Sequence, residues 1–279
     1  MNLTASPNAL LKQRIKEHWE KESCGLRNGA STDRRRFFQE IDEERYRQEP
    51  MIPSIAQFAK QRGKRVLEVG LGTGSDFMQW VRAGADAYGR DLTEASVRTV
   101  KERLQIEALT ANVALGDAES LSEFPDNYFD VYYSWGVLMA TPDTEKAISE
   151  AYRVLKPGGS LIIMLYHYPS VGVYLVWAAQ GLLRFKFKSP RACYFDNVES
   201  PGMKMYSTKE GRALVGKYFK RYTIEVKTYL GAGDLLTQRL SPRYRAPIWR
   251  IAQKIYPRWF VKRVLGDRFG TELTIATIK

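Results

Sequence analysis

Between Arg65 and His167, short apolar segments alternate with amphipathic stretches of helical length. The apolar segments read RVLEVG, DAYGRDL, NVALGD, FDVYYSWG and SLIIMLYH, and the stretches between them include SDFMQWVRAG, TEASVRTVKERLQIE and DTEKAISEAYRVLKPGG. Because strands that are connected through helices pair in parallel, this alternation predicts βαβ units in an open, doubly wound sheet. The sequence LKPGG at 155–159 is interpreted as a turn before the fifth strand.

The segments on either side of this core divide the chain further. Residues 1–60 are expected to form a helical lid, with one helix around Leu10–Lys21 and a second that Asp33 caps and Pro50 ends. Residues 61–279 form the main domain, in which YTIEVKTYL and ELTIATIK are expected to be strands and Thr208 to cap a helix. Two insertions interrupt it, at about 168–206 and 231–270.

Composition excludes several classes of protein. Among 279 residues there are two cysteines, Cys24 and Cys193, and two histidines, which are too few and too scattered for a disulfide framework or a zinc site. We therefore expect no metal. The N-terminal segment has no signal-peptide core, which predicts a cytoplasmic protein. The longest apolar run, Val171–Leu183, has 13 residues and is too short to span a bilayer.

The sequence VLEVGLGTGSDF at 66–77 predicts a ligand-binding turn after the first strand. Gly70, Gly72 and Gly74 allow the backbone to approach a ligand closely, and Ser75 stands where dinucleotide-binding loops usually carry a further glycine. Asp91, at the end of the second strand, is placed to accept the hydroxyls of a ribose, and Asp117 follows the third strand. Each acid also has the alternative role of a helix cap or turn residue.

Together these segments resemble the class I S-adenosylmethionine-dependent methyltransferases, of the small-molecule, type 11 kind. The resemblance covers 65–167 and implies a Rossmann-like, open twisted sheet, mostly parallel with an antiparallel last strand, and helices on both faces. It implies S-adenosyl-L-methionine as the cofactor. The residues that it assigns to the methionine part, the ribose, the adenine and the sulfonium are Glu68, Gly70, Gly72, Gly74, Asp91, Leu92, Asp117, Ala118, Tyr133, Ser134 and Trp135.

The acceptor is approached by exclusion. The segment after the fourth strand reads YSWGVL and lacks the motif of methyltransferases that act on nucleobase amines. The sequence motifs of enzymes that methylate pyrimidine carbons, protein arginines or, with a metal, catechols are also missing. We therefore expect metal-independent O-, N- or C-methylation of a small, partly hydrophobic metabolite. Candidates for a general base are His167, Tyr46 and Tyr166, whose alternative role is to shape the pocket.

The C-terminal third is basic, with 21 Lys and Arg against 7 Asp and Glu from residue 181 to 279. Its segment YRAPIWRIAQKIYPRWFVKRVLG interleaves these charges with Trp249, Tyr256, Trp259 and Phe260. Such a pattern suits an anionic membrane, an acidic or lipid-like acceptor, a nucleic acid or a subunit interface. A nucleic-acid partner is not favoured, but an RNA methyltransferase and a catalytically inactive cofactor-binding scaffold remain the alternative functions.

Overall fold

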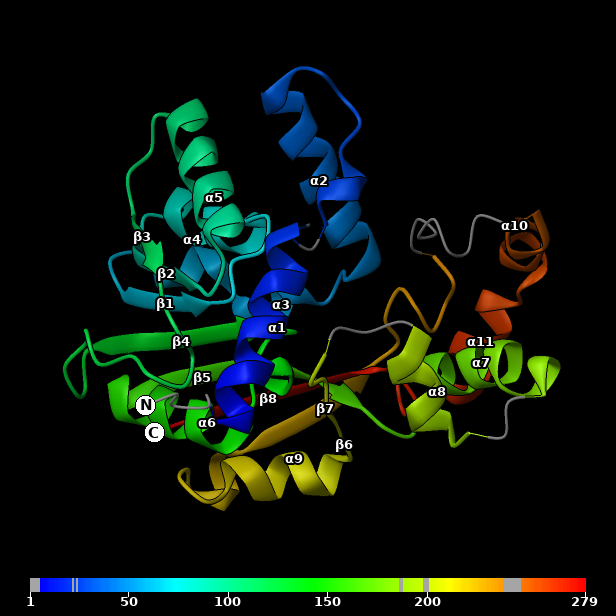
Figure 1. Cartoon of the computed structure of the whole chain (residues 1–279). Helices are drawn as coiled ribbons and strands as arrows, with labels where there is room; N and C mark the ends of the chain where they lie inside the picture. The colour runs from blue at the N-terminus through cyan, green and yellow to red at the C-terminus, as the bar shows by residue number, and fades with distance from the viewer. Residues whose placement is uncertain (1–5, 22, 24, 186–187, 198–200, 238–246) are drawn as a thin grey trace, which may run out of the picture.

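The computed structural model describes residues 6–21, 23, 25–185, 188–197, 201–237 and 247–279. Cys24 lies outside the described residues, as does the side chain of Trp249. Within them the chain forms a single eight-stranded sheet flanked by helices, with a second group of helices beyond one edge (Figure 1).

The sheet has the strand order β3-β2-β1-β4-β5-β8-β7, with β6 paired to the end of β5. The first five strands and β6 pair in parallel, whereas β8 runs antiparallel to both β5 and β7. This confirms the predicted mostly parallel sheet with an antiparallel last strand. The strands are β1 (Arg65–Val69), β2 (Asp86–Asp91), β3 (Asn112–Leu115), β4 (Phe129–Trp135), β5 (Leu155–His167), β6 (Met205–Tyr206), β7 (Glu225–Tyr229) and β8 (Glu272–Ile278).

Helices cover both faces of the sheet (Figure 1). On one face α4 and α5 pack on the strands, and the N-terminal helices α1 and α2 pack against them; α6 and α9 cover the other face. The helices are α1 (Pro7–Lys21), α2 (Arg34–Gln48), α3 (Ile52–Ala56), α4 (Ser75–Arg82), α5 (Glu94–Glu107), α6 (Thr144–Val154), α7 (Val171–Gln180), α8 (Pro190–Asn197), α9 (Thr208–Val215), α10 (Pro247–Ile255) and α11 (Arg258–Leu265). Asp33 caps α2 as predicted, accepting a hydrogen bond from the Arg36 amide.

Two local predictions were wrong. Ser207, not Thr208, caps α9, because Ser207 and Glu210 form a reciprocal capping box that needs this three-residue spacing. The strand β5 begins at Leu155, so LKPGG lies within it. Residues 156–159 are nevertheless displaced from β4, since Phe129 pairs with Leu155 while Val131 pairs with Ser160.

The two insertions form a lobe beyond the end of β5, which we call the insertion lobe (168–185, 188–197, 231–237 and 247–270) (Figure 1). Asp234 joins it to the sheet. Its fully buried carboxylate accepts hydrogen bonds from the amides of Gly172, Gly231 and Thr271 and from the Thr271 hydroxyl, at 2.6 to 2.9 Å. One side chain therefore fixes the start of α7, the start of the second insertion and the start of β8.

The hydrophobic core lies on both sides of the sheet, where Phe77, Trp80, Phe129 and Ile163 are fully buried. Val173 and Tyr194 of the insertion lobe form a smaller cluster with Met205 of β6. No helix in the described part of the chain has the length and apolar composition that a bilayer span requires.

Candidate functional site

The glycine loop connects β1 to α4 at the carboxyl edge of the sheet. Gly70 and Gly74 have φ values of +87° and +79°, which side chains rarely adopt. A Cβ at Gly70 would lie 2.1 Å from Val137, and one at Gly74 would lie 2.6 Å from Val100. Packing within the protein is thus enough to require both glycines. Their predicted role toward a cofactor, and that of Gly72, stays a prediction.

Asp91 lies at the end of β2 and supports this loop directly. Its Oδ2 accepts hydrogen bonds from the amides of Leu71 at 2.8 Å and Gly72 at 3.2 Å, and its Oδ1 accepts from the amide and hydroxyl of Thr93. Burial raises the pKa of Asp91, although these bonds act against the rise. The helix cap that follows is Thr93, so Asp91 does not have the alternative role of N-cap.

Glu68 lies on β1 beneath the loop. Its Oε2 accepts a hydrogen bond of 2.7 Å from the Trp80 indole, and the residue is 3 % exposed. Burial and the charge of Asp76 raise the pKa of Glu68 well above its ordinary value. A cation bound beside this carboxylate would relieve the cost of keeping it charged.

Asp76, in the first turn of α4, is the centre of a buried network that connects the lid to the loop. Its carboxylate accepts hydrogen bonds from Arg45, through Nε at 3.0 Å and Nη2 at 2.5 Å. It also accepts hydrogen bonds from the Tyr46 hydroxyl at 3.0 Å and the Tyr133 hydroxyl at 2.8 Å. Burial alone would lower the pKa of Arg45, but Asp76 and Glu49 raise it. Tyr46 is therefore a hydrogen-bond donor within this network, and burial and Asp76 raise its pKa.

Two buried polar atoms without a hydrogen bond lie at the ends of elements next to the predicted site. Among the described residues, Ser75 Oγ at the start of α4 and Glu272 Oε2 at the start of β8 have no hydrogen-bond partner. Ser134 differs, because its hydroxyl donates to the Val69 carbonyl at 2.8 Å. Burial, and then the neighbouring charge of Glu49, raises the pKa of Glu272 well above its ordinary value. An unpaired buried hydroxyl and an unpaired buried carboxylate oxygen are each suited to a polar ligand.

Asp117 and Ala118 lie after β3, under the lid helix α1. Lys12 Nζ is 2.6 Å from Asp117 Oδ2 and 2.6 Å from Glu119 Oε2. Asp117 Oδ1 accepts a hydrogen bond from the Glu119 amide. This contact belongs to a turn, which is the alternative role that the sequence allows for Asp117. Leu92 is half-buried after Asp91, and Ala118 is buried. The lid thus closes directly over the predicted adenine end.

His167 and Tyr166 end β5, where Tyr166 pairs with Glu272 of β8. His167 Nδ1 lies 2.9 Å from the Gly270 carbonyl, which accepts hydrogen bonds only, so Nδ1 carries the proton and Nε2 is the basic nitrogen. Burial lowers the pKa of His167. Tyr166 packs against both hydrophobic clusters. The structure therefore places Tyr46 beside the glycine loop and the other two candidate bases beside the insertion lobe.

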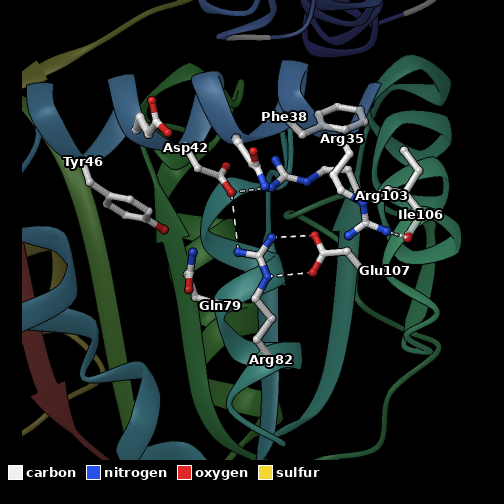
Figure 2. A pocket seen from close by; sticks show the side chains of 11 residues that line it. Arg35, Phe38, Asp42, Tyr46, Gln79, Arg82, Arg103, Ile106 and Glu107 are labelled. Carbon is white, nitrogen blue, oxygen red and sulfur yellow. Dashed lines mark hydrogen bonds and ion pairs between the residues drawn. The ribbon is translucent and has the colours of Figure 1, made fainter. Parts of the chain in front are cut away.

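A cavity of about 650 Å³ lies between α2, α4 and α5, and it contains none of the predicted cofactor residues (Figure 2). Asp42 lies between Arg103 and Arg82, at 2.6 and 3.5 Å, and Arg82 also pairs with Glu107 (Figure 2). Arg103 donates in addition to the Thr73 carbonyl in the glycine loop. These charges are largely satisfied by one another, so we assign the cavity to the docking of α2 on the core.

Sequence reasoning missed the residues that connect distant segments: Lys12, Arg45, Glu49, Asp76 and Glu272. Asp76 had a signal, because an acid in the first turn after a glycine loop is a common helix-stabilising feature. Arg45 and Glu49 had the local signal of an i,i+4 ion pair, at 3.2 Å. Lys12 and Glu272 had none, since their neighbours meet them only when the lid or the last strand packs on the core. No group of three or more His, Cys, Asp or Glu in the described part of the chain could hold a metal ion.

Comparison with known proteins identifies the central segment. A family model for the methyltransferase domain matches residues 67–163. The ubiquinone/menaquinone biosynthesis C-methyltransferase UbiE of Yersinia enterocolitica is 36% identical over 115 residues, which cover 39% of this chain. The match spans 45% of the length of that relative, so the chain covers less than half of it.

Solved structures share the fold. Phosphoethanolamine N-methyltransferase 2 of Haemonchus contortus, in complex with phosphomonomethylethanolamine and S-adenosylhomocysteine, has a TM-score of 0.57 at 21% identity, covering 82% of this chain and 52% of that one. A SAM-dependent methyltransferase of Archaeoglobus fulgidus has a TM-score of 0.53 at 16% identity, covering 87% and 100%. Residues 67–163 therefore carry a methyltransferase domain, and the chain has the fold of these methyltransferase structures.

Proposed function

We propose that this protein transfers a methyl group from S-adenosyl-L-methionine to a small, partly hydrophobic metabolite. The observation that carries the proposal is the set of buried acids at the carboxyl edge of the sheet. Glu68, Asp91 and Glu272 are buried, and burial is the first cause that raises the pKa of each. Burying these carboxylates costs free energy, and a cofactor that carries a sulfonium and an ammonium would offset that cost.

The residues present fit such a cofactor. Asp91 would accept the ribose hydroxyls, Glu68 would face the ammonium, and Asp117 with Ala118 would meet the adenine. When bound, the cofactor supplies a methyl group on a strongly activated sulfur. The protein's own contribution is to hold donor and acceptor in line and to exclude water, which accounts for much of the acceleration in such displacements. The lid, tied to α4 through Arg45 and Asp76, serves that exclusion.

The acceptor is expected next to the end of β5. Tyr166 and the buried Val173 make an apolar wall there, and UbiE, named for quinone biosynthesis, supports a lipophilic acceptor. His167 is in its neutral form at pH 7, because burial lowers its pKa. Its Nε2 would accept the proton of a hydroxyl or amine acceptor. Metal independence and a cytoplasmic location stay predictions.

Calorimetry tests the cofactor assignment. We expect S-adenosylhomocysteine to bind and NAD not to bind. Replacing Asp91 with Asn should weaken binding by roughly 10-fold or more, since hydrogen bonds to a charged group contribute about 1.5–3 kcal/mol. Asp86→Asn, at the exposed start of the same strand, is the matched control and should leave affinity unchanged. Absence of binding by the wild type would refute the proposal.

Methyl-labelled cofactor tests the reaction. Incubation with extracts should label a small organic-soluble compound. Label in RNA would favour the RNA methyltransferase instead. Cofactor binding without label in any fraction would favour the inactive scaffold.

A further inference from the structure

Helices α10 and α11 expose large apolar side chains to solvent. Ile251, Ile255, Trp259, Phe260 and Val264 are between 54% and 75% exposed. Ile251 and Ile255 are one turn apart and share a face of α10, as Phe260 and Val264 share a face of α11. We call the exposed side chains of residues 250–264 the α10–α11 surface. Apolar side chains gathered in this way mark a contact surface rather than scattered exposure.

Basic side chains lie among these apolar ones. Arg250, Lys254, Lys262 and Arg263 are all exposed on the same two helices. From residue 247 to 268 the chain carries six Lys and Arg and a single acid, Asp267. The surface therefore has strong positive charge as well as apolar character, and a partner must complement both properties.

We propose that the α10–α11 surface docks on an anionic lipid bilayer. Amphipathic helices with Lys and Arg among Trp, Phe and aliphatic side chains lie in the interface of such membranes, where the apolar groups leave water and the charges meet headgroups. A nucleic acid would use the basic and aromatic side chains but leave Ile251, Ile255 and Val264 in water. A second copy of this chain would bring like charges together.

The place of this surface in the fold favours the same partner. The buried Asp234 carboxylate binds amides at the start of α7 and of β8, and Tyr256, between α10 and α11, donates to the Asp234 carbonyl at 3.0 Å. Arg258 donates to the carbonyls of Leu235 and Leu236. The surface is therefore fixed to the sheet near the end of β5, where a docked protein would have its site close to the lipid.

Vesicle cosedimentation of the full chain tests the proposal. We expect binding to phosphatidylcholine vesicles that contain phosphatidylglycerol to be at least 10-fold stronger than to phosphatidylcholine alone. The double variant Trp259→Ser/Phe260→Ser should weaken it by roughly 10-fold or more, because both rings leave the interface. Lys254→Glu/Lys262→Glu should remove the preference for anionic vesicles, as each basic residue near such a surface contributes about 5-fold.

Two controls keep the experiment decisive. Tyr222→Ser removes an aromatic ring that is 82% exposed outside the lobe, and it should bind vesicles as the wild type does. Unfolding temperatures should be unchanged in all variants, since the altered side chains are exposed. Equal binding to both kinds of vesicle would overturn the proposal. So would a dimer that Trp259→Ser/Phe260→Ser dissociates, or an RNA affinity that exceeds the vesicle affinity and falls with salt.

Discussion

Replacing Asp76 with Asn tests whether the buried network at the glycine loop holds the lid on the core. The substitution keeps the volume of the side chain. It places a neutral amide where the carboxylate accepts hydrogen bonds from Arg45, Tyr46 and Tyr133. Removing one partner of a buried ion pair costs about 3–5 kcal/mol. Arg45 keeps Glu49 at 3.2 Å, so we expect the lower end of this range, about 3 kcal/mol.

This loss is large compared with a total stability of about 5–15 kcal/mol. For a chain of this size each kcal/mol shifts the melting temperature by roughly 2–4 °C, so the variant should melt about 6–12 °C below the wild type. Differential scanning calorimetry measures it. The control is Asp86→Asn, because Asp86 lies 3.6 Å from Arg65 with both side chains about half exposed, and such a pair contributes at most about 1 kcal/mol.

A double variant separates the charge effect from a packing effect. In Asp76→Asn/Arg45→Met the uncompensated cation is gone, so part of the lost stability should return. If Asp76→Asn melts within a degree or two of Asp86→Asn, the network does not stabilise the protein and the reasoning is refuted. If the double variant is less stable than either single variant, packing dominates instead.

Three further predictions concern single side chains. The folded-state pKa of Glu272 is raised, so the stability linked to its proton is full below about pH 4.5 and is lost as pH rises through that pKa. Glu272→Gln should therefore stabilise the protein more at pH 8 than at pH 5 in thermal unfolding, and an equal effect at both pH values would contradict the linkage. With a hydroxyl or amine acceptor, His167→Gln should lower kcat by roughly 10²- to 10⁴-fold, and the wild-type rate should persist below pH 6.5; an unchanged rate would show that no base acts there. Ser207→Ala should cost about 1 kcal/mol in urea unfolding and Thr208→Ala less than about 0.5 kcal/mol, and equal losses would contradict the capping box.

The parts of the fold that could be predicted are those that local sequence patterns determine. The strands from β1 to β5 appear as short apolar runs, and acids at the ends of β2 and β3 follow from the rule that ligands bind at the carboxyl edge of such a sheet. The positions of Asp91 and Asp117 at that edge were therefore within reach of the sequence.

The contacts that close the site could not be predicted in this way. Arg45 and Asp76 are 31 residues apart and Lys12 and Asp117 are 105 apart, and nothing in their local sequence pairs them. Such pairs depend on how the lid packs, which is decided by the whole core. The choice of Thr208 over Ser207 failed for a smaller reason, because both residues favour the cap and only the position of Glu210 distinguishes them.

The pairing of β7 with β8 has a consequence for how freely the second insertion can change. Tyr229 pairs with Glu272, so the whole segment between them is one long connection in a hairpin. The entropic cost of closing a loop grows slowly with its length, by about 0.6 kcal/mol per doubling. Closing this connection therefore costs only about 2 kcal/mol more than closing a short hairpin loop. The hydrogen bonds of Asp234, each with a net contribution of about 1 kcal/mol, offset that entropy. The closure cost of this long connection is therefore offset at its base, next to the sheet, and changes in its outer helices would leave that balance unaltered.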